Sequence, residues 1–381
     1  HELVRTLGQL LKKGWRPNRS IILISWDASS YGLVGSTEWV ELHKEWVYEQ
    51  SIAYIDVGSV SGNLFDAQGS PLLHRLLYQV TQDVFDPQQS QSIYDAWKKN
   101  KYISSPASSS FITTELSSTC ISNITSHQQQ EEDDGEEEGN KDDSSTIQYP
   151  YNTVLIDPLK VNNDGFAFFQ HVGVPTLSLR FKSNQFGVSN SEEDNLDWMN
   201  KFGDSTFTYH QAMVRIVGLL TLRLSSEQLL PMYPTDYASL LLHYADELSA
   251  THDCRPLPSL TTSLLMLQSS SGFFYRKAEK YRRQLKVKQH YSNKLKKHMK
   301  RHNQAVTRFE RSFLDPLGSP SDDHRPWLKH AIYSPQLDSP TTTVLFPSIV
   351  HAIQKQDPVY TRQMEERVTA MIMTAHDTLH I

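Results

Sequence analysis

Short apolar runs alternate with segments of helical periodicity over the first 232 residues. Three runs, at Ile21–Ser25, Ile52–Val57 and Pro175–Phe181, are bounded by polar or turn-forming residues, as is typical of strands. Between them, apolar residues recur every three to four positions, which predicts helices over 1–13, Ser36–Gln50, Pro71–Phe85, Ser92–Lys99 and Gly165–His171. This alternation predicts an α/β domain with a mixed or parallel sheet flanked by helices.

The pattern changes at about Tyr233, after which helical spacing dominates. It predicts helices at Tyr237–Ser249, Ser259–Asn303, Ala305–Leu314 and Met364–Leu379, while Val344–Ile349 is ambiguous. We therefore expect two domains. An α/β domain covers 1–232, and an all-α helical bundle covers 233–381.

Residues 104–148 interrupt the α/β pattern. They are rich in Ser and Thr, then in Gln, and then in acidic residues. Such a composition buries too little apolar surface to offset the entropy of ordering the chain, so it predicts a disordered surface insert. An acidic segment that binds a partner is the alternative.

The charge and the hydropathy limit the partners of this chain. It has 37 Lys and Arg against 43 Asp and Glu, a net charge of −6, which argues against a general affinity for nucleic acid. No run of about 18 apolar residues occurs, so no segment is expected to span a membrane. The two cysteines, Cys120 and Cys254, define no disulfide framework.

The stretch 276–301 is strongly basic. Nucleic-acid binding is one interpretation. The favoured one is the solvated face of a long helix, because Tyr281, Leu285 and Leu295 indicate a packed face on the same segment. Docking to an acidic partner, or to the chain's own insert at Glu131–Asp143, is the third interpretation.

Three motifs carry a resemblance to a known family. They are Ser25–Ala28 (SWDA), Gly35–Trp39 (GSTEW) and Phe313–Gly318 (FLDPLG). They resemble the zinc peptidase family of glutamate carboxypeptidase II and the transferrin receptor. The resemblance implies the C-terminal part of a zinc exopeptidase-like α/β domain, followed by a transferrin receptor-like helical dimerisation domain. Since the chain begins with His1 rather than Met, we expect a segment of a longer protein.

The same resemblance locates a two-zinc site. In active relatives the loop reads Trp-Asp-Ala-Glu-Glu-Phe-Gly, in which the first Glu is the general base and the second is a zinc ligand. Here the two positions are Ser29 and Ser30, a ligand Asp falls at Gly58, and a ligand His falls at Asn190. Serine hydroxyls, glycine and an amide supply neither the anions nor the imidazole that zinc takes. We expect no zinc, with Asp56 as the one nearby replacement carboxylate.

Other residues of the family's substrate cleft are retained. Asp27 is expected to support the loop, and Asn163 and Asp164 match a loop beside the substrate. The alternative for Asp164 is the N-cap of the helix that follows it. Arg180 matches one of two arginines that grip an acidic substrate, and the position of the second arginine is Ser178. These residues are interpreted as a vestigial cleft.

The resemblance implies a non-catalytic, membrane-anchored, dimeric receptor or sorting adaptor with a protein cargo that the sequence does not identify. It would dimerise through its C-terminal helices, and its anchor would lie upstream of this chain. Asn18 and Asn123 begin glycosylation sequons, which agrees with the lumenal or extracellular side of an endosome, vacuole or plasma membrane. The alternative is an active zinc-dependent carboxypeptidase or aminopeptidase with altered ligands.

Overall fold

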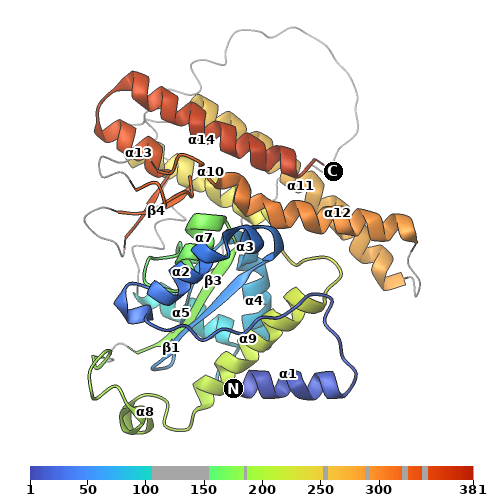
Figure 1. Cartoon of the computed structure of the whole chain (residues 1–381), viewed down its shortest axis with the longest axis vertical. Coiled ribbons are helices and arrows are strands. Elements are labelled where there is room, and N and C mark those ends of the chain that lie inside the picture. The colour runs from blue at the N-terminus through green and yellow to red at the C-terminus, as the bar shows by residue number, and fades with distance from the viewer. Residues whose placement is uncertain are drawn as a thin grey trace.

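The structure is a computed structural model that describes residues 1–104, 154–183, 187–251, 256–287, 292–319, 325–336 and 342–380. It consists of an α/β part followed by a helical part, as the sequence predicts, and Figure 1 shows the helical layer stacked on the sheet and its helices. The expected insert after Ser104, the sequon at Asn123 and both cysteines lie outside the described residues.

The sheet has three strands, β1 (Tyr54–Val60), β3 (Thr176–Lys182) and β2 (Leu64–Gly69), in that order. β1 runs parallel to β3 and β2 runs antiparallel to it, so the sheet is mixed, as expected. The sequence pattern does not predict β2. Asp66 and Gln68 interrupt its apolar run, and both are buried in the folded chain.

The prediction of a strand at Ile21–Ser25 is wrong. This segment has no strand pairing, and the side chains of Ile22, Leu23 and Ile24 are exposed. An apolar run forms a strand only where a neighbouring strand accepts its backbone hydrogen bonds. None of the described strands pairs with this segment.

The two faces of the sheet differ in chemistry. Leu177, Leu179 and Phe181 of β3 point into the main apolar core, which α4 (His74–Asp83), α5 (Ile93–Ser104) and α9 (Thr208–Ser226) complete. Because side chains alternate along a strand, the residues between these three point to the opposite face. That face carries Ser178 and Arg180, and it is covered in part by α2 (Val34–Leu42), α3 (Lys44–Gln50) and α7 (Phe166–Val172).

The predicted helix Ser36–Gln50 is divided in the structure into α2 and α3, which meet at His43. Shorter elements complete this part of the molecule: α1 (Glu2–Lys12) packs on α9, and α8 (Leu196–Phe202) lies farther from the sheet (Figure 1). Two short 3-10 helices occur at Ser29–Tyr31 (η1) and Pro71–Leu73 (η2).

The helical part is built on α11 (Pro258–Val287), which packs against α10 (Pro234–Thr251) and α14 (Pro358–Thr378). The predicted helix Ser259–Asn303 is in fact two helices, α11 and α12 (Asn293–Phe309). The remaining elements are α13 (Pro347–Gln354), the 3-10 helix η4 (Glu310–Phe313), and the strand pair β4 (Tyr333–Pro335) and β5 (Thr343–Leu345).

A buried carboxylate joins the two parts. Glu310 is fully buried and accepts hydrogen bonds from the hydroxyls of Ser70, which follows β2, and Tyr237, on α10. His330 Nδ1 accepts the N–H of Ile332, so its proton lies on Nε2, which donates to Glu310 Oε1 at 3.1 Å. Most of the buried apolar residues of the two parts, within the described ranges, also form one cluster. The domain boundary at residue 232 stays a prediction.

Within the ranges that the structure describes, we find no helix with the length and apolar character needed to cross a membrane.

Candidate functional site

The loop that carries Ser29 and Ser30 is held from both ends. Trp26 donates its indole N–H to the hydroxyl of Tyr54 on β1 at 2.8 Å and packs on Trp39 of α2. At the other end, α2 approaches the loop so closely that a Cβ on Gly35 would lie 2.5 Å from the carbonyl oxygen of Asp27. Glycine at position 35 therefore allows α2 to fix the loop over the polar face of the sheet.

Asp164 faces this loop and not its own helix. Its two carboxylate oxygens accept hydrogen bonds from Ser29 at 2.7 Å and from Ser36 at 2.6 Å. The alternative of an N-cap is therefore wrong, since α7 has no side-chain cap. Asn163 has a local role instead: its Oδ1 accepts the N–H of Gly165, and its Nδ2 donates to the carbonyl of Lys160.

Ser30 and Asn190 contact each other directly. The hydroxyl of Ser30 donates to Oδ1 of Asn190 at 3.2 Å, across 160 residues of sequence. Asn190 has a φ of 62°, a left-handed conformation that asparagine tolerates better than most residues. The structure thus brings together two positions to which the resemblance assigns zinc ligands in active relatives.

Asp56 and Gly58 lie two residues apart on the same face of β1. Asp56 accepts a hydrogen bond from Ser178 at 2.7 Å, and burial raises the pKa of its carboxyl to about 6, with a further contribution from the charge of Asp164. A Cβ on Gly58 would lie 3.3 Å from the carbonyl of Leu179. A carboxylate at position 58 would therefore fit only if β3 shifted by a few tenths of an ångström.

Arg180 is already paired within the sheet. Its Nε and Nη2 donate to Oδ2 of Asp66 on β2 at 2.9 and 2.6 Å, and Lys182 Nζ lies 3.6 Å from the same oxygen. Asp66 is buried, so this ion pair neutralises a charge in the interior. The expected second arginine position, Ser178, is bonded to Asp56.

The last two predicted residues lie apart from this cluster or at its rim. Asp27 is exposed and accepts the backbone N–H of Ala28, which supports the expected role in the loop. Asn18 is exposed, and its side-chain amide donates to the carbonyl of Ser226 at the end of α9. Its glycosylation stays a prediction.

The side chains at this face do not fit a two-zinc site. Zinc takes Cys, His, Asp and Glu, and a catalytic site needs three such ligands beside the reacting water. Here the carboxylates are Asp56 and Asp164, and serine hydroxyls already donate to both. Among all residues that the structure describes, no three His, Cys, Asp or Glu side chains gather where they could hold a metal ion.

Two partners in this cluster were not predicted from the sequence. Ser36 lies within the GSTEW motif, but nothing in the motif indicates that its hydroxyl reaches residue 164. Asp66, the partner of Arg180, could have been noticed as a lone carboxylate in an otherwise apolar run, Leu64–Ala67.

The fold and the site define a class: a peptidase-like α/β domain with a polar sheet face, followed by a helical domain. A family model described as the transferrin receptor-like dimerisation domain matches residues 257–380. The chain is similar to a probable glutamate carboxypeptidase, LAMP1, of Arabidopsis thaliana, with 31% identity over 97% of this chain and 46% of the relative. The chain belongs to the family that contains the glutamate carboxypeptidases and the transferrin receptors.

Other relatives carry different activities in their names. An aminopeptidase, NAALADL1, of Mus musculus is 28% identical over 94% of this chain and 43% of its own length. Transferrin receptor protein 2 of Homo sapiens is 25% identical over 84% of this chain and 34% of its own length. The chain spans less than half the length of these relatives.

Proposed function

We propose that this chain is part of a non-catalytic, membrane-anchored, dimeric receptor or trafficking adaptor whose ancestor was a zinc peptidase. The observation that carries the proposal is the direct hydrogen bond between Ser30 and Asn190, beside that between Ser29 and Asp164. In a metal enzyme the residues at such positions bind the metal ions, which balance their charges. Here direct hydrogen bonds between neutral side chains, or to one carboxylate, connect the same loops.

The four neutral positions also argue against catalysis on chemical grounds. A serine hydroxyl does not ionise near neutral pH, so Ser29 cannot accept a proton from an attacking water. Ser30, Gly58 and Asn190 leave two dications without most of their ligands. The proposal therefore includes the absence of a zinc cofactor.

Zinc stoichiometry tests this proposal. Residues 1–381 and the full-length protein are equilibrated with zinc, dialysed, and measured by elemental analysis, and we expect no retained metal. The matched variant carries Ser29→Glu, Ser30→Glu, Gly58→Asp and Asn190→His together and is expected to gain zinc affinity, whereas Ser30→Glu alone is not. Two retained zinc ions per wild-type chain would refute the non-catalytic interpretation.

The second candidate is an active zinc-dependent exopeptidase with altered ligands. Two carboxylates, Asp56 and Asp164, lie on the site face, and some relatives are named carboxypeptidases or aminopeptidases. Release of amino acids from peptides by the full-length protein, abolished by Asp56→Asn and by a chelator, would favour this candidate.

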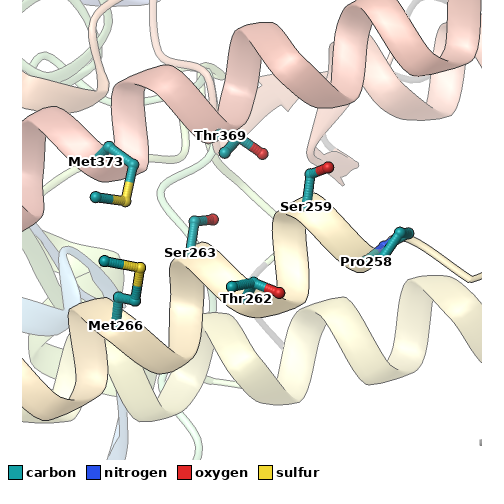
Figure 2. Close-up of a pocket in the computed structure, with 7 residues that line it drawn as sticks. All are labelled: Pro258, Ser259, Thr262, Ser263, Met266, Thr369 and Met373. Atoms are coloured by element: carbon teal, nitrogen blue, oxygen red, sulfur yellow. The ribbon is translucent and has the colours of Figure 1, made fainter.

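We further propose that the helical part forms a homodimer through α11 and α14. Figure 2 shows the close-up of a shallow cavity of about 390 Å³ between these helices, in which Met266 and Met373 point toward each other. Thr369 also lines it, and its hydroxyl is buried without a hydrogen-bond partner among the described residues. All of the lining residues fall within the matched dimerisation domain, which supports a second copy of this chain as the occupant.

The location on the lumenal or extracellular side of a membrane is part of the same proposal. The exposed sequon at Asn18 and the relative named as a transferrin receptor support it. Detection of an N-linked glycan on Asn18 of protein from its native source would test it.

A further inference from the structure

The positive charge of this chain is concentrated in one hairpin. Residues 276–308 contain 13 of the 37 Lys and Arg residues and one of the 43 acidic residues. The rest of the chain therefore has 24 basic against 42 acidic residues. A chain of modest net charge thus consists of a strongly basic segment and a strongly acidic remainder.

This basic hairpin, defined as residues 276–287 and 293–308 without the residues between them, comprises the end of α11 and most of α12. Figure 1 shows both helix segments reaching sideways beyond the sheet domain. Their apolar side is occupied: Leu295 and Met299 are buried against Leu229, with Tyr281 and Leu285 packed on the cluster. The hairpin is therefore a folded element whose remaining surface is charged.

Among the residues that the structure describes, most of this charge has no ion-pair partner. Arg282 pairs with Glu279 at 2.6 Å, and Lys277 lies over the ring of Phe273. Ten other basic side chains are exposed, and no carboxylate of the described residues lies within ion-pair distance of them. They are Arg276, Lys280, Arg283, Lys286, Lys294, Lys296, Lys297, Lys300, Arg301 and Arg308.

The exposed cations of α12 extend over a length that exceeds the range of a screened charge. The 17 residues of α12 span about 25 Å, whereas charges in physiological salt are screened beyond about 8 Å. An anion near the outer turns of α12 therefore interacts mainly with the cations closest to it. Such a field raises the association rate of an oppositely charged partner.

We propose that the basic hairpin is a docking surface for an acidic polypeptide. This inference specifies the partner chemistry of the receptor or adaptor proposed above and rests on that function only for its biological role. Six of the ten exposed cations are lysines, hydrated point charges on flexible stems, which attract an acidic chain without requiring one fixed geometry.

The other polyanions fit this surface less well. No described aromatic residue of the hairpin is exposed for base stacking, since Tyr281 stacks on His298. The apolar side of α12 is buried in the protein, so it has no face to insert into a bilayer.

The test is a titration of labelled poly-L-glutamate with residues 1–381, followed by fluorescence anisotropy at several salt concentrations. The variant carries Lys296→Gln, Lys297→Gln, Lys300→Gln and Arg301→Gln, which lie on the exposed side of α12 and leave Leu295 and Met299 in place. The control carries Lys12→Gln, Lys13→Gln, Lys99→Gln and Lys201→Gln, which removes the same charge from exposed sites elsewhere.

We expect the hairpin variant to bind poly-L-glutamate about tenfold more weakly, and the control to bind within a factor of two of wild type, because each exposed ion pair contributes about twofold. The affinity should fall as salt rises. Equal losses in both variants, or no binding by wild type, would overturn the proposal. So would tighter binding to duplex DNA or to phosphatidylserine vesicles than to poly-L-glutamate.

The same titration with a zinc chelator separates this inference from the non-catalytic function. Binding that persists with the chelator supports the hairpin irrespective of the zinc result. Binding that disappears with the chelator would assign the interaction to a metal site and would contradict the hairpin proposal.

Discussion

Asp56 is a largely buried carboxyl at the candidate site. Burial beside Asp164 raises its pKa to about 6 from an ordinary 3.8, while the hydroxyl of Ser178 offsets part of the effect. The folded state therefore holds this proton more tightly than the unfolded state does. Its contribution to stability is fully present below about pH 4 and is lost as the pH rises through 6.

Asp56→Asn should consequently stabilise the protein above pH 6 and leave it unchanged near pH 4. Two pKa units correspond to at most about 3 kcal/mol, and the asparagine Oδ1 can still accept from Ser178. Urea unfolding at pH values from 4 to 8 measures the difference. Asp27→Asn, an exposed carboxylate in the neighbouring loop, is the control. Parallel stability curves for wild type and Asp56→Asn would show that this carboxyl is not perturbed.

The sequence identified several residues of this cluster but not their partners. The contacts Ser29–Asp164 and Ser30–Asn190 join positions that are 135 and 160 residues apart. Local patterns contain no information on such distances, and only the resemblance indicated that these segments meet. Asp164 is an example. Its position before a helix favoured a role as the N-cap, but in the structure α7 has no side-chain cap.

At the scale of elements, the contact between α2 and the loop that carries Ser29 and Ser30 decides the site geometry. Gly35→Ala would place a methyl group 2.5 Å from the carbonyl oxygen of Asp27, and backbone has little freedom to retreat. We expect a loss of about 1–3 kcal/mol in the free energy of unfolding. Gly8→Ala in α1 is the matched control, since its Cβ meets nothing within 4 Å and alanine favours helix.

Thermal or urea unfolding of the two variants checks this prediction. Gly8→Ala should stabilise the chain slightly or leave it unchanged. If Gly35→Ala unfolds at the same denaturant concentration as wild type, the loop moves freely relative to α2, and the close approach has no structural importance.

Helices and strands were predictable where residues close in the sequence determine them. Helices α10, α11 and α14 have a sustained apolar period and were predictable. β2 was not, because Asp66 breaks its apolar run and is paired only with residues far along the chain, such as Arg180, which is 114 residues away. Ile21–Ser25 failed for the opposite reason, since its local pattern favours a strand but no described strand pairs with it.

At the scale of the whole molecule, the cavity between α11 and α14 leads to a prediction about assembly. Charged residues at its centre, Met266→Glu with Met373→Glu, should raise the dimer dissociation constant at least tenfold, because desolvating a carboxylate in an apolar interface is costly. Light scattering of the protein at micromolar concentration gives the mass. Leu196→Glu on α8, an exposed apolar site outside the helical part, is the control.

If the dimer persists with both methionine substitutions, the interface lies on another surface of the protein. A wild-type monomer under these conditions would contradict the homodimer altogether. A change in both variants would point to general destabilisation instead, which circular dichroism of the same samples detects.

The buried hydrogen bonds of Glu310 also limit which chimeras between this protein and its relatives can fold. Its carboxylate belongs to the helical half of the chain, yet one of its donors, Ser70, belongs to the sheet half. A chimera that joins the sheet half of a relative to this helical half keeps Glu310 with its donors Tyr237 and His330, but it keeps a donor at position 70 only if the relative supplies one. Crossovers near residue 232 should therefore succeed between parents matched at position 70 and fail, by leaving a buried charge short of partners, between parents that are not.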